Sequence, residues 1–258
     1  MPKSKLLLFC GPCQIESKEH ALFIAKEIKS ITNDLPVELY YKSSYDKANR
    51  TSLEGKRGIG IDEGLSILSA VKSELGLPVL TDIHTPDEAL RVGKVVDIIQ
   101  TPAFLCRQTD LLIAAGKSGA AVNIKKGQFL FPLDMKFAAE KVASTGNNKI
   151  FLCERGTSFG YRDLVFDPRS LVWMKSLGYP VIYDATHSVQ VMGGDNGSSG
   201  GHREMIVPLA KAAAAIGVDG IFIETHEEPK RAPSDGASML PLKDLRKALE
   251  DIIRVRGE

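Results

Sequence analysis

The sequence predicts a single (β/α)8 barrel, also called a TIM barrel, and three observations support this fold class. Short apolar or β-branched runs alternate with longer amphipathic stretches along the 258 residues. Eight runs of each kind occur, and no linker rich in proline, glycine or serine divides them. Eight strand–helix repeats in about 250 residues are typical of this barrel. We therefore expect residues 1–258 to form one barrel domain.

The predicted strands are mostly near-continuous apolar runs, as expected for parallel strands that are buried on both faces. Each run is too short for a helix of ordinary length, and most carry β-branched residues. The predicted strands are Leu6–Cys10, Val37–Ser43, Val79–His84, Ile98–Thr101, Ala121–Lys125, Ile150–Glu154, Val181–Thr186 and Gly220–Thr225.

The stretches between the strands have the periodicity of amphipathic helices. The first, Lys18–Ile31, follows Ser17, which is a suitable N-cap. Pro86, Pro168 and Pro241 stand where a first helical turn accepts proline. The predicted helices are Lys18–Ile31, Ile61–Leu75, Pro86–Val96, Asp110–Lys117, Leu133–Ser144, Asp167–Leu177, Arg203–Ile216 and Pro241–Val255.

An open, doubly wound sheet is the alternative architecture for such an alternation. That fold binds dinucleotides through a glycine-rich turn after its first strand. No G-x-G-x-x-G motif follows the first predicted strand, so a dinucleotide site has no support in this sequence.

The composition excludes several classes of protein. Lys and Arg number 33 and Asp and Glu 32, so the net charge is 33 − 32 = +1, which argues against a nucleic-acid-binding surface. No apolar run approaches the ~20 residues of a transmembrane helix, and Leu6–Cys10 is too short for a signal peptide. The four cysteines are too few and too scattered for a disulfide framework, which predicts a reducing, cytoplasmic location.

Reactive side chains follow every predicted strand. In a barrel of this kind the chemistry lies at the carboxyl ends of the strands and in the loops that follow them. In strand order these side chains are Cys13; Lys42, Lys47, Asn49 and Arg50; Asp82 and His84; Gln100 and Arg107; Asn123, Lys125 and Lys126; Glu154 and Arg155; Asp184 and His187; and Glu224, His226 and Asp235.

Several of the cations predict an anion-binding pocket. Lys42 and Lys125 lie inside otherwise apolar strands, and an unpaired buried ammonium group is costly, so a bound anion is implied. Together with Lys47 and Arg155 they would surround a small, multiply charged ligand, while Arg50 and Arg107 lie further along their loops and could bind a second phosphate. The alternative for any one lysine is a solvated rim position or an ordinary salt bridge.

Cys13, His187, Glu224 and Asp235 form a possible metal set, because a thiolate, an imidazole and two carboxylates suit a divalent transition ion. Their spacing alone is weak evidence. Cys13 could instead be a small buried hydrophobic residue, and His187 a hydrogen-bonded core histidine. Cys10 and Cys13 also form a C-x-x-C pair, but Gly11 and Pro12 lie between them rather than a helix start, which disfavours redox use.

The loop Gln190–Arg203 is rich in glycine and leads into a predicted helix. Its backbone N–H groups could hold a phosphate, since such groups are free at the start of a helix. A flexible surface lid is the alternative, and the two interpretations are compatible.

These segments together resemble the 3-deoxy-D-manno-octulosonate 8-phosphate synthases over essentially the whole chain. The motifs are long and therefore specific. They are G-P-C-Q-I-E-S at Gly11–Ser17, Y-K-S-S-Y-D-K-A-N-R at Tyr41–Arg50, T-D-I-H at Thr81–His84, Q-T-P-A-F-L-C-R-Q-T-D at Gln100–Asp110, N-I-K-K-G-Q-F at Asn123–Phe129, C-E-R-G-T-S-F-G-Y at Cys153–Tyr161, D-A-T-H-S-V-Q at Asp184–Gln190, S-G-G-H-R-E at Ser199–Glu204 and F-I-E-T-H at Phe222–His226.

The resemblance implies the condensation of phosphoenolpyruvate, D-arabinose 5-phosphate and water to the eight-carbon keto-sugar acid phosphate and inorganic phosphate. It also implies a role in lipopolysaccharide biosynthesis and a homotetramer. Family members of the metal-dependent branch carry Cys where the metal-independent branch carries Asn, so Cys13 implies a divalent metal such as Zn²⁺, Fe²⁺, Mn²⁺ or Co²⁺. The matching metal ligands are Cys13, His187, Glu224 and Asp235.

The same matching assigns the substrate sites. Phosphoenolpyruvate would contact Lys42, Lys47, Lys125 and Arg155. The sugar phosphate would contact Asn49, Arg50, Ser199 and Arg107, with Arg107 reaching in from a neighbouring subunit. We also expect Thr51 and Gln100 at the substrate site. The groups expected to take part in catalysis are Cys13, Asp82, His187 and Asp235, with His84 beside Asp82 in a proton network.

The sister family, the 3-deoxy-D-arabino-heptulosonate 7-phosphate synthases, uses erythrose 4-phosphate and is the main alternative. That family carries K-P-R-T-S where the octulosonate enzymes carry K-A-N-R-S. This chain has K-A-N-R-T-S at Lys47–Ser52, so Ala48 and Asn49 favour the octulosonate reaction, while Thr51 departs from the commoner Ser and keeps a hydroxyl. A non-catalytic phospho-sugar-binding protein is a third possibility.

Overall fold

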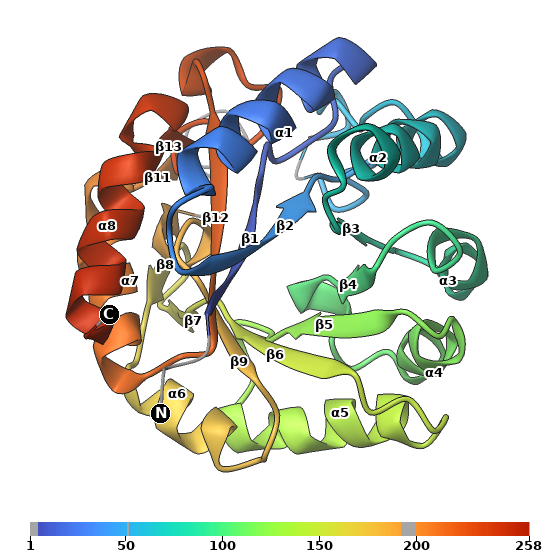
Figure 1. Ribbon diagram of the computed structural model, residues 1–258. Coiled ribbons are helices and arrows are strands. Elements are labelled where there is room, and N and C mark those ends of the chain that lie inside the picture. The colour runs from blue at the N-terminus through green and yellow to red at the C-terminus, as the bar shows by residue number, and fades with distance from the viewer. Residues whose placement is uncertain (1–4, 51, 192–199, 258) are drawn as a thin grey trace.

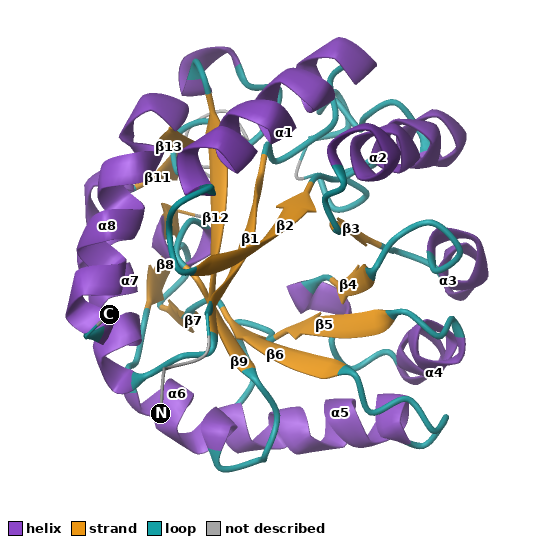
Figure 2. Cartoon of the chain, in the orientation of Figure 1, coloured by secondary structure: helices purple, strands orange, loops and turns teal. Residues whose placement is uncertain are grey.

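A closed ring of parallel strands surrounded by helices forms the molecule (Figure 1). The computed structural model describes residues 5–50, 52–191 and 200–257. The ring order is β1-β2-β3-β4-β5-β6-β9-β12, and β12 pairs with β1 to close it. Figure 2 shows the strands inside and the helices outside, which confirms the predicted (β/α)8 barrel.

The ring strands agree closely with the predicted ones. They are β1 Leu6–Gly11, β2 Val37–Lys42, β3 Val79–Asp82, β4 Ile98–Thr101, β5 Ala121–Lys125, β6 Ile150–Glu154, β9 Val181–Asp184 and β12 Gly220–His226. The prediction extended the seventh strand to Thr186, but Asp184 ends it because its carboxylate accepts hydrogen bonds from the backbone N–H groups of Thr186 and His187. The third strand likewise ends at Asp82, two residues before the predicted end.

The eight outer helices follow the predicted order with shifted ends. They are α1 Lys18–Thr32, α2 Ile61–Leu75, α3 Pro86–Val92, α4 Thr109–Lys117, α5 Met135–Ala143, α6 Arg169–Lys175, α7 Ile206–Ile216 and α8 Leu245–Arg256. The Ser17 side chain caps α1 by accepting a hydrogen bond from His20 N, and Pro86 begins α3, as predicted.

The predicted starts of four helices were too early. For α5, predicted from Leu133, a 3-10 turn at Pro132–Asp134 precedes the helix. Pro168 is the N-cap of α6 rather than a residue of its first turn. Separate 3-10 turns precede α7 at Arg203–Met205 and α8 at Leu242–Asp244, and Pro241 lies in a short strand, β13 Leu240–Pro241. A 3-10 turn at the start of an α-helix continues the spacing of apolar residues in that helix, so the sequence does not show where the turn ends and the helix begins.

Short strands outside the ring were not predicted. The hairpin β7 Thr157–Phe159 and β8 Asp163–Val165 follows β6. A two-residue pairing joins β10 Gln190–Val191 to β11 Gly200–Gly201 at the two described ends of the glycine-rich loop. Elements of two or three residues are too short for a detectable hydrophobic period.

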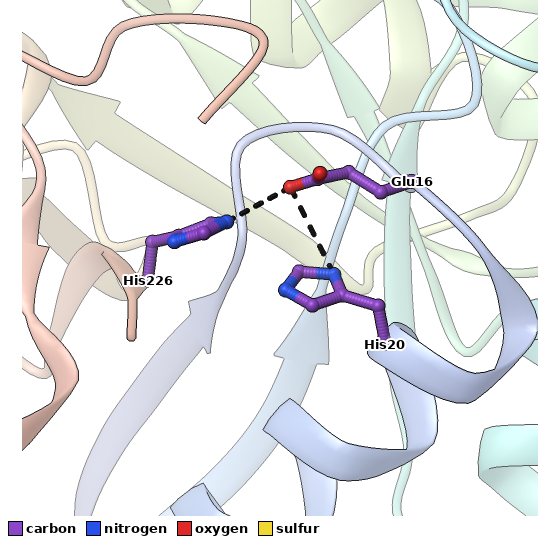
Figure 3. A group of neighbouring side chains, drawn as sticks. All are labelled: Glu16, His20 and His226. Carbon is purple, nitrogen blue, oxygen red and sulfur yellow. Dashed lines mark hydrogen bonds and ion pairs between the residues drawn. The ribbon is translucent and has the colours of Figure 1, made fainter. Parts of the chain in front are cut away.

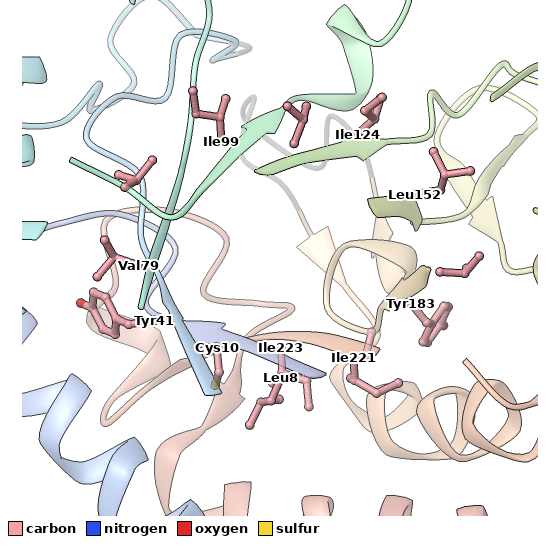
Figure 4. Packing of buried hydrophobic residues seen from close by; sticks show 14 of the residues in the cluster. Leu8, Cys10, Tyr41, Val79, Ile99, Ile124, Leu152, Tyr183, Ile221 and Ile223 are labelled. Atoms are coloured by element: carbon pink, nitrogen blue, oxygen red, sulfur yellow. The ribbon is translucent and has the colours of Figure 1, made fainter. Parts of the chain in front are cut away.

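The barrel strands separate two apolar regions. Side chains such as Leu8, Cys10 and Tyr41 belong to the large core between strands and helices (Figure 4). The opposite faces of the strands form a second, smaller cluster inside the barrel: Phe9, Leu80, Ile98, Cys153, Ile182 and Phe222. Alternation along β1 shows the arrangement, because Leu8 and Cys10 belong to the outer core and Phe9 to the inner cluster.

Within the described residues, no helix has both the length and the apolar character needed to cross a membrane. All four cysteines are buried and free.

Candidate active site

A cavity of about 810 Å³ opens at the carboxyl ends of the ring strands, where the sequence predicted the chemistry. Ten of the predicted site residues line it: Lys42, Lys47, Asn49, Arg50, Asp82, Gln100, Lys125, Arg155, His187 and Asp235. Two of the ring's charged residues lie directly above the inner apolar cluster, since the Phe222 ring lies 3.9 Å from Lys125 Nζ and 5.4 Å from Lys42 Nζ. The two ammonium groups therefore lie over the face of an aromatic ring, which stabilises their positive charge.

Lys42 and Lys125 are not the unpaired buried cations that the sequence suggested. Lys42 Nζ lies 2.7 Å from Glu224 Oε1 and also donates to Ser44 Oγ at 3.1 Å. Lys125 Nζ lies 2.5 Å from Asp184 Oδ2. Each ammonium is thus paired with a carboxylate of another strand, so the premise that these two lysines are unpaired was wrong, while the anion itself stays a prediction.

Lys47 and Arg155 supply the positive charge that remains. Both are buried, and among the described residues neither forms an ion pair. Burial lowers the pKa of Lys47, but the negative charges that develop at Cys13, Glu224, Asp82 and Asp235 raise it above its ordinary value. Burial lowers the pKa of Arg155.

The Arg155 guanidinium is only partly satisfied inside the protein. Nη2 donates to Gln190 Oε1 at 3.0 Å, while the buried Nη1 has no hydrogen-bond partner among the described residues. A buried, unpaired donor costs free energy, and an anionic ligand would satisfy it. Arg155 and Lys47 thus place two buried cations without an ion-pair partner among the described residues in the wall of this cavity.

The cluster below these cations has the donor set of a transition-metal site. One ligand atom each from Cys13, Glu224 and Asp235 lies within 4.8 Å of the others. The Cys13 thiol donates to Asp235 Oδ2 at 3.1 Å, and His187 Nε2 lies 3.4 Å from Glu224 Oε2. The structure therefore brings together all four residues of the predicted metal set.

Three further observations test whether these residues fit a divalent cation. His187 Nδ1 lies 2.8 Å from Asp184 Oδ2, which orients the ring and leaves Nε2 for a metal, as in carboxylate–histidine–metal arrangements. Glu224 Oε2 is buried and has no hydrogen-bond partner among the described residues. Asp235, with φ 53°, is the non-glycine residue that the described backbone holds in the left-handed region, a strained conformation that clusters at functional sites. The donor set fits the cation.

The charges of the cluster depend on its surroundings. Burial raises the pKa of the Cys13 thiol, and the nearby Glu224 raises it further. Burial also raises the pKa of Glu224, but His187 and the neighbouring lysines outweigh this effect and hold it well below its usual range. The thiol is therefore protonated until a cation lies beside it, because a bound metal ion is the charge that stabilises a buried thiolate.

Asp82 and His84 form a second ionisable group at the cavity wall. His84 Nε2 lies 3.2 Å from Asp82 Oδ2, and Asp82 Oδ1 accepts a hydrogen bond from Ser44 Oγ. Burial lowers the pKa of His84, but its contacts with Asp82 and Glu88 raise it to about 9. At neutral pH the ring is an imidazolium that faces the cavity and can donate a proton.

Three predicted substrate residues are not found in the cavity. Arg107 lies in a separate pocket of about 220 Å³ with Phe137 and Lys141. Thr51 and Ser199 lie outside the described residues. Arg50 does line the cavity, but its guanidinium is held by Ser234 Oγ at 2.7 Å and by Gln14 Oε1 at 3.0 Å, so within one chain Arg50 and Arg107 do not share a site.

The sequence reasoning missed two polar residues that connect the anion and metal regions. The Gln190 amide accepts from Arg155 and donates to Asp235 Oδ1 at 2.9 Å. Ser234 Oγ donates to Asp235 Oδ2 at 2.8 Å and accepts from the Cys13 thiol at 3.2 Å. Both are sequence neighbours of predicted site residues, and that adjacency was the available signal.

Comparison with known proteins shows the family of this chain. The model of the family described as the DAHP synthetase I family matches residues 3–255. The chain belongs to the DAHP synthetase I family. Among curated proteins, a 2-dehydro-3-deoxyphosphooctonate aldolase of Rhizobium meliloti (strain 1021) is 56% identical over 251 residues, which cover 97% of this chain and 90% of the relative.

Other members of the DAHP synthetase I family with the same name are equally similar. The protein of Agrobacterium fabrum is 57% identical over 246 residues, covering 95% of this chain and 87% of the relative. That of Brucella anthropi is 54% identical, covering 95% and 89%. These similarities extend over nearly the whole chain.

Proposed function

We propose that this chain is a transferase that condenses phosphoenolpyruvate with D-arabinose 5-phosphate and water to give 3-deoxy-D-manno-octulosonate 8-phosphate and phosphate. The observation that carries the proposal is the cavity itself, where the buried cations Lys47 and Arg155 face the Cys13–Glu224–Asp235 cluster. The curated relatives named 2-dehydro-3-deoxyphosphooctonate aldolase, at 56% and 57% identity, support it. The product belongs to lipopolysaccharide biosynthesis, and the free buried cysteines favour a reducing cytoplasm.

Phosphoenolpyruvate binds among Lys47, Arg155, Lys42 and Lys125. The phosphate and carboxylate need positive charge that the protein does not already neutralise, and Lys47 and Arg155 supply it. Lys42 and Lys125 approach the same region but share their charge with Glu224 and Asp184. They therefore orient the ligand more than they attract it.

The aldose phosphate occupies the outer part of the cavity. Asn49, Arg50 and Gln100 line it within one chain, and Thr51 and Ser199 complete this set by resemblance. Arg107 belongs to the cavity of a neighbouring subunit in a homotetramer. In support, the residues around Arg107 expose large aromatic side chains, which are typical of a subunit contact: Phe104, Phe129, Phe131 and Phe137 are 45%, 61%, 50% and 60% exposed.

The reaction requires that one carbon–carbon bond form and one carbon–oxygen bond break. The enol carbon of phosphoenolpyruvate attacks the aldehyde carbon, the aldehyde oxygen takes up a proton, and water adds at the second carbon with loss of its own proton. Collapse of this adduct breaks the carbon–oxygen bond to phosphate, passes the proton of the new hydroxyl group to the departing phosphate and leaves the ketone. His84, held by Asp82, supplies the proton at the cavity wall, and Lys47 with Arg155 stabilises the phosphate as it leaves.

Cys13, His187, Glu224 and Asp235 would hold a divalent transition ion, as the resemblance to the metal-dependent branch implies, and the proximity of their side chains supports this. Such an ion, when bound, polarises and orients a carbonyl or acidifies a water molecule. Gln190 and Asp184 fix the orientation of Asp235 and His187 from behind. These contacts keep the four donors directed toward one point.

The decisive experiment compares aldose phosphates. Phosphate release from phosphoenolpyruvate is measured with D-arabinose 5-phosphate, with erythrose 4-phosphate and with neither. We expect release with the pentose phosphate, little with the tetrose phosphate and none without an aldose. Preference for erythrose 4-phosphate would establish the heptulosonate reaction instead, and no release with any aldose would leave only a binding protein.

Metal dependence has its own test. Excess chelator should abolish activity, and Zn²⁺, Fe²⁺, Mn²⁺ or Co²⁺ should restore it. Cys13→Asn should lose metal binding while keeping part of the activity, because asparagine replaces this cysteine in the metal-independent branch. Full activity in excess chelator contradicts the metal assignment, and tight metal retention by the variant contradicts Cys13 as a ligand.

A further inference from the structure

A second cluster of metal-ligating side chains lies beside the candidate active site. Glu16, His20 and His226 each place one ligand atom within 4.8 Å of the others (Figure 3). None of the three lines the 810 Å³ cavity. Glu16 follows Cys13 by three residues and His226 follows Glu224 by two, so the two clusters share the same two segments of chain.

The rings present one nitrogen each to the same carboxylate oxygen. His226 Nε2 lies 2.9 Å from Glu16 Oε1, and His20 Nδ1 lies 3.9 Å from it. Figure 3 shows the Glu16 carboxylate between the two rings. His20 Nδ1 is buried and has no hydrogen-bond partner among the described residues, so one nitrogen directed at this point is unsatisfied.

The outer nitrogens of both rings face a second carboxylate. Glu227 Oε2 lies 3.1 Å from His20 Nε2 and 3.3 Å from His226 Nδ1. Metal-ligating histidines almost always donate their other ring N–H to such a group, which fixes the tautomer and the ring orientation. Glu227 therefore occupies the position of a supporting residue, and Glu16 that of a direct ligand.

One backbone hydrogen bond determines which nitrogen of His226 carries the ring proton. The backbone N–H of Glu228 donates to His226 Nδ1 at 2.9 Å, which keeps the ring proton on Nε2 while that nitrogen contacts Glu16. Binding of a cation at Nε2 moves this proton to Nδ1, where Glu227 Oε2 accepts it, and the Glu228 N–H gives up its bond. No other proton changes place, because His20 Nδ1 is already without a partner.

We propose that His20 Nδ1, His226 Nε2 and Glu16 Oε1 form a second site for a divalent transition cation, with water completing its coordination. Two imidazoles and one carboxylate suit Zn²⁺, Co²⁺, Ni²⁺ or Cu²⁺ rather than Mg²⁺ or Ca²⁺. Ligands about 2.0–2.1 Å from tetrahedral Zn²⁺ lie roughly 3.3 Å apart, so the observed 2.9 and 3.9 Å contacts need shifts of only a few tenths of an ångström. Glu16 and Glu227 are 33% and 40% exposed, which leaves the cation a route from solvent.

The site ties the start of α1 to the end of β12. His20 belongs to the first turn of α1, Glu16 to the loop before it, and His226 ends β12. A bound cation therefore fixes the loop that carries Cys13 against the strand that carries Glu224. Thermal stability should rise when this outer site is filled, independently of the inner cluster.

The experiment counts Zn²⁺ per chain by equilibrium dialysis of the full-length protein and metal analysis. We compare the wild type with His20→Gln, Cys13→Ala and the double variant, and we use His202→Gln as the matched control because His202 is an exposed histidine paired with Glu204. The expected stoichiometries are two for the wild type and the control, one for each single variant and none for the double variant. Circular dichroism verifies that each variant is folded.

The outcomes separate the two sites. If the inner site alone were absent, the wild type and Cys13→Ala would both bind one ion and His20→Gln none. If the outer site is absent, Cys13→Ala binds none and His20→Gln binds as many ions as the wild type, which overturns the proposal. Glu227→Gln gives a second measure that does not remove a ligand, and its outer-site affinity should fall about 10–100-fold; unchanged affinity would reject the supporting role of Glu227.

Discussion

The buried ion pair between Lys126 and Glu154 gives a quantitative prediction. Both side chains are 0% exposed, and Lys126 Nζ lies 3.6 Å from Glu154 Oε2. Lys126 also donates to the backbone oxygens of Gly127 and Gly156 at 3.3 Å. Glu154 Oε1 accepts from Gly156 N, while Oε2 has no hydrogen-bond partner in the described part of the chain. Removing the lysine therefore leaves a buried carboxylate without an ion-pair partner among the described residues.

The expected cost of Lys126→Met follows from the protonation of that carboxylate. A buried carboxylate without a partner avoids the penalty of its charge by taking up a proton. A glutamate has an ordinary pKa of about 4.3, so pH 7 is about 2.7 units higher, and protonating the carboxylate at pH 7 costs about 3.7 kcal/mol. This value lies within the loss of about 3–5 kcal/mol that is typical when one partner of a buried ion pair is removed. At pH 5 the same step costs about 1 kcal/mol. The variant should therefore recover stability as the pH falls, because neutralising the buried charge then costs less free energy.

The assay is equilibrium unfolding in urea at pH 5 and pH 7, followed by the fluorescence of Trp173 and by circular dichroism. The matched control is Lys126→Met combined with Glu154→Gln, which removes the charge and keeps an acceptor for Gly156 N. This double variant should be more stable than Lys126→Met at pH 7. A loss below about 1 kcal/mol at pH 7, or an equal loss at both pH values, would refute the electrostatic reasoning.

Three further predictions concern other parts of the barrel. The pKa of His84 rises from 6.5 to about 9 on folding, so about 3 kcal/mol of stability is present below pH 6.5 and is lost as the pH rises through 9; His84→Gln should lack this pH dependence in urea titrations. Gly11→Ala should lower the free energy of unfolding by about 3 kcal/mol or more, because its Cβ would lie 2.0 Å from the Lys42 carbonyl oxygen; an unchanged urea midpoint would reject the close approach. Ser17→Ala should cost about 1 kcal/mol through loss of the hydrogen bond from His20 N, and Ser17→Thr, which keeps the acceptor, should cost less in the same titration.

The sequence predicted the ring strands well because their signal is local. The bounds of β4, β5 and β6 agree at both ends, since each apolar run stops at a polar residue. The end of β9 was predicted two residues late because the Asp184 side chain terminates it through bonds to the backbone. A side-chain-to-backbone contact of this kind depends on the folded geometry, which the spacing of apolar residues does not report.

The membership of the candidate site was easier to predict than its charge balance. The residues near the strand ends were correctly placed around one cavity, because parallel strands in a barrel present the same ends to one side. The partner of Lys42 was not predicted, since Glu224 lies 182 positions away and approaches only because β2 and β12 both flank β1. Arg107 lies outside the cavity of its own chain, and its expected contact with a neighbouring subunit, which rests on the family resemblance, stays a prediction.

The inner apolar cluster limits how ligands can enter and leave the cavity. Phe9, Leu80, Ile98 and Phe222 fill the barrel interior beneath the ammonium groups, so these side chains close the cavity on that side. A ligand that lies against Lys125 and the Phe222 ring would therefore be the innermost one. If a second ligand covered it, the inner ligand would have to bind first and leave last.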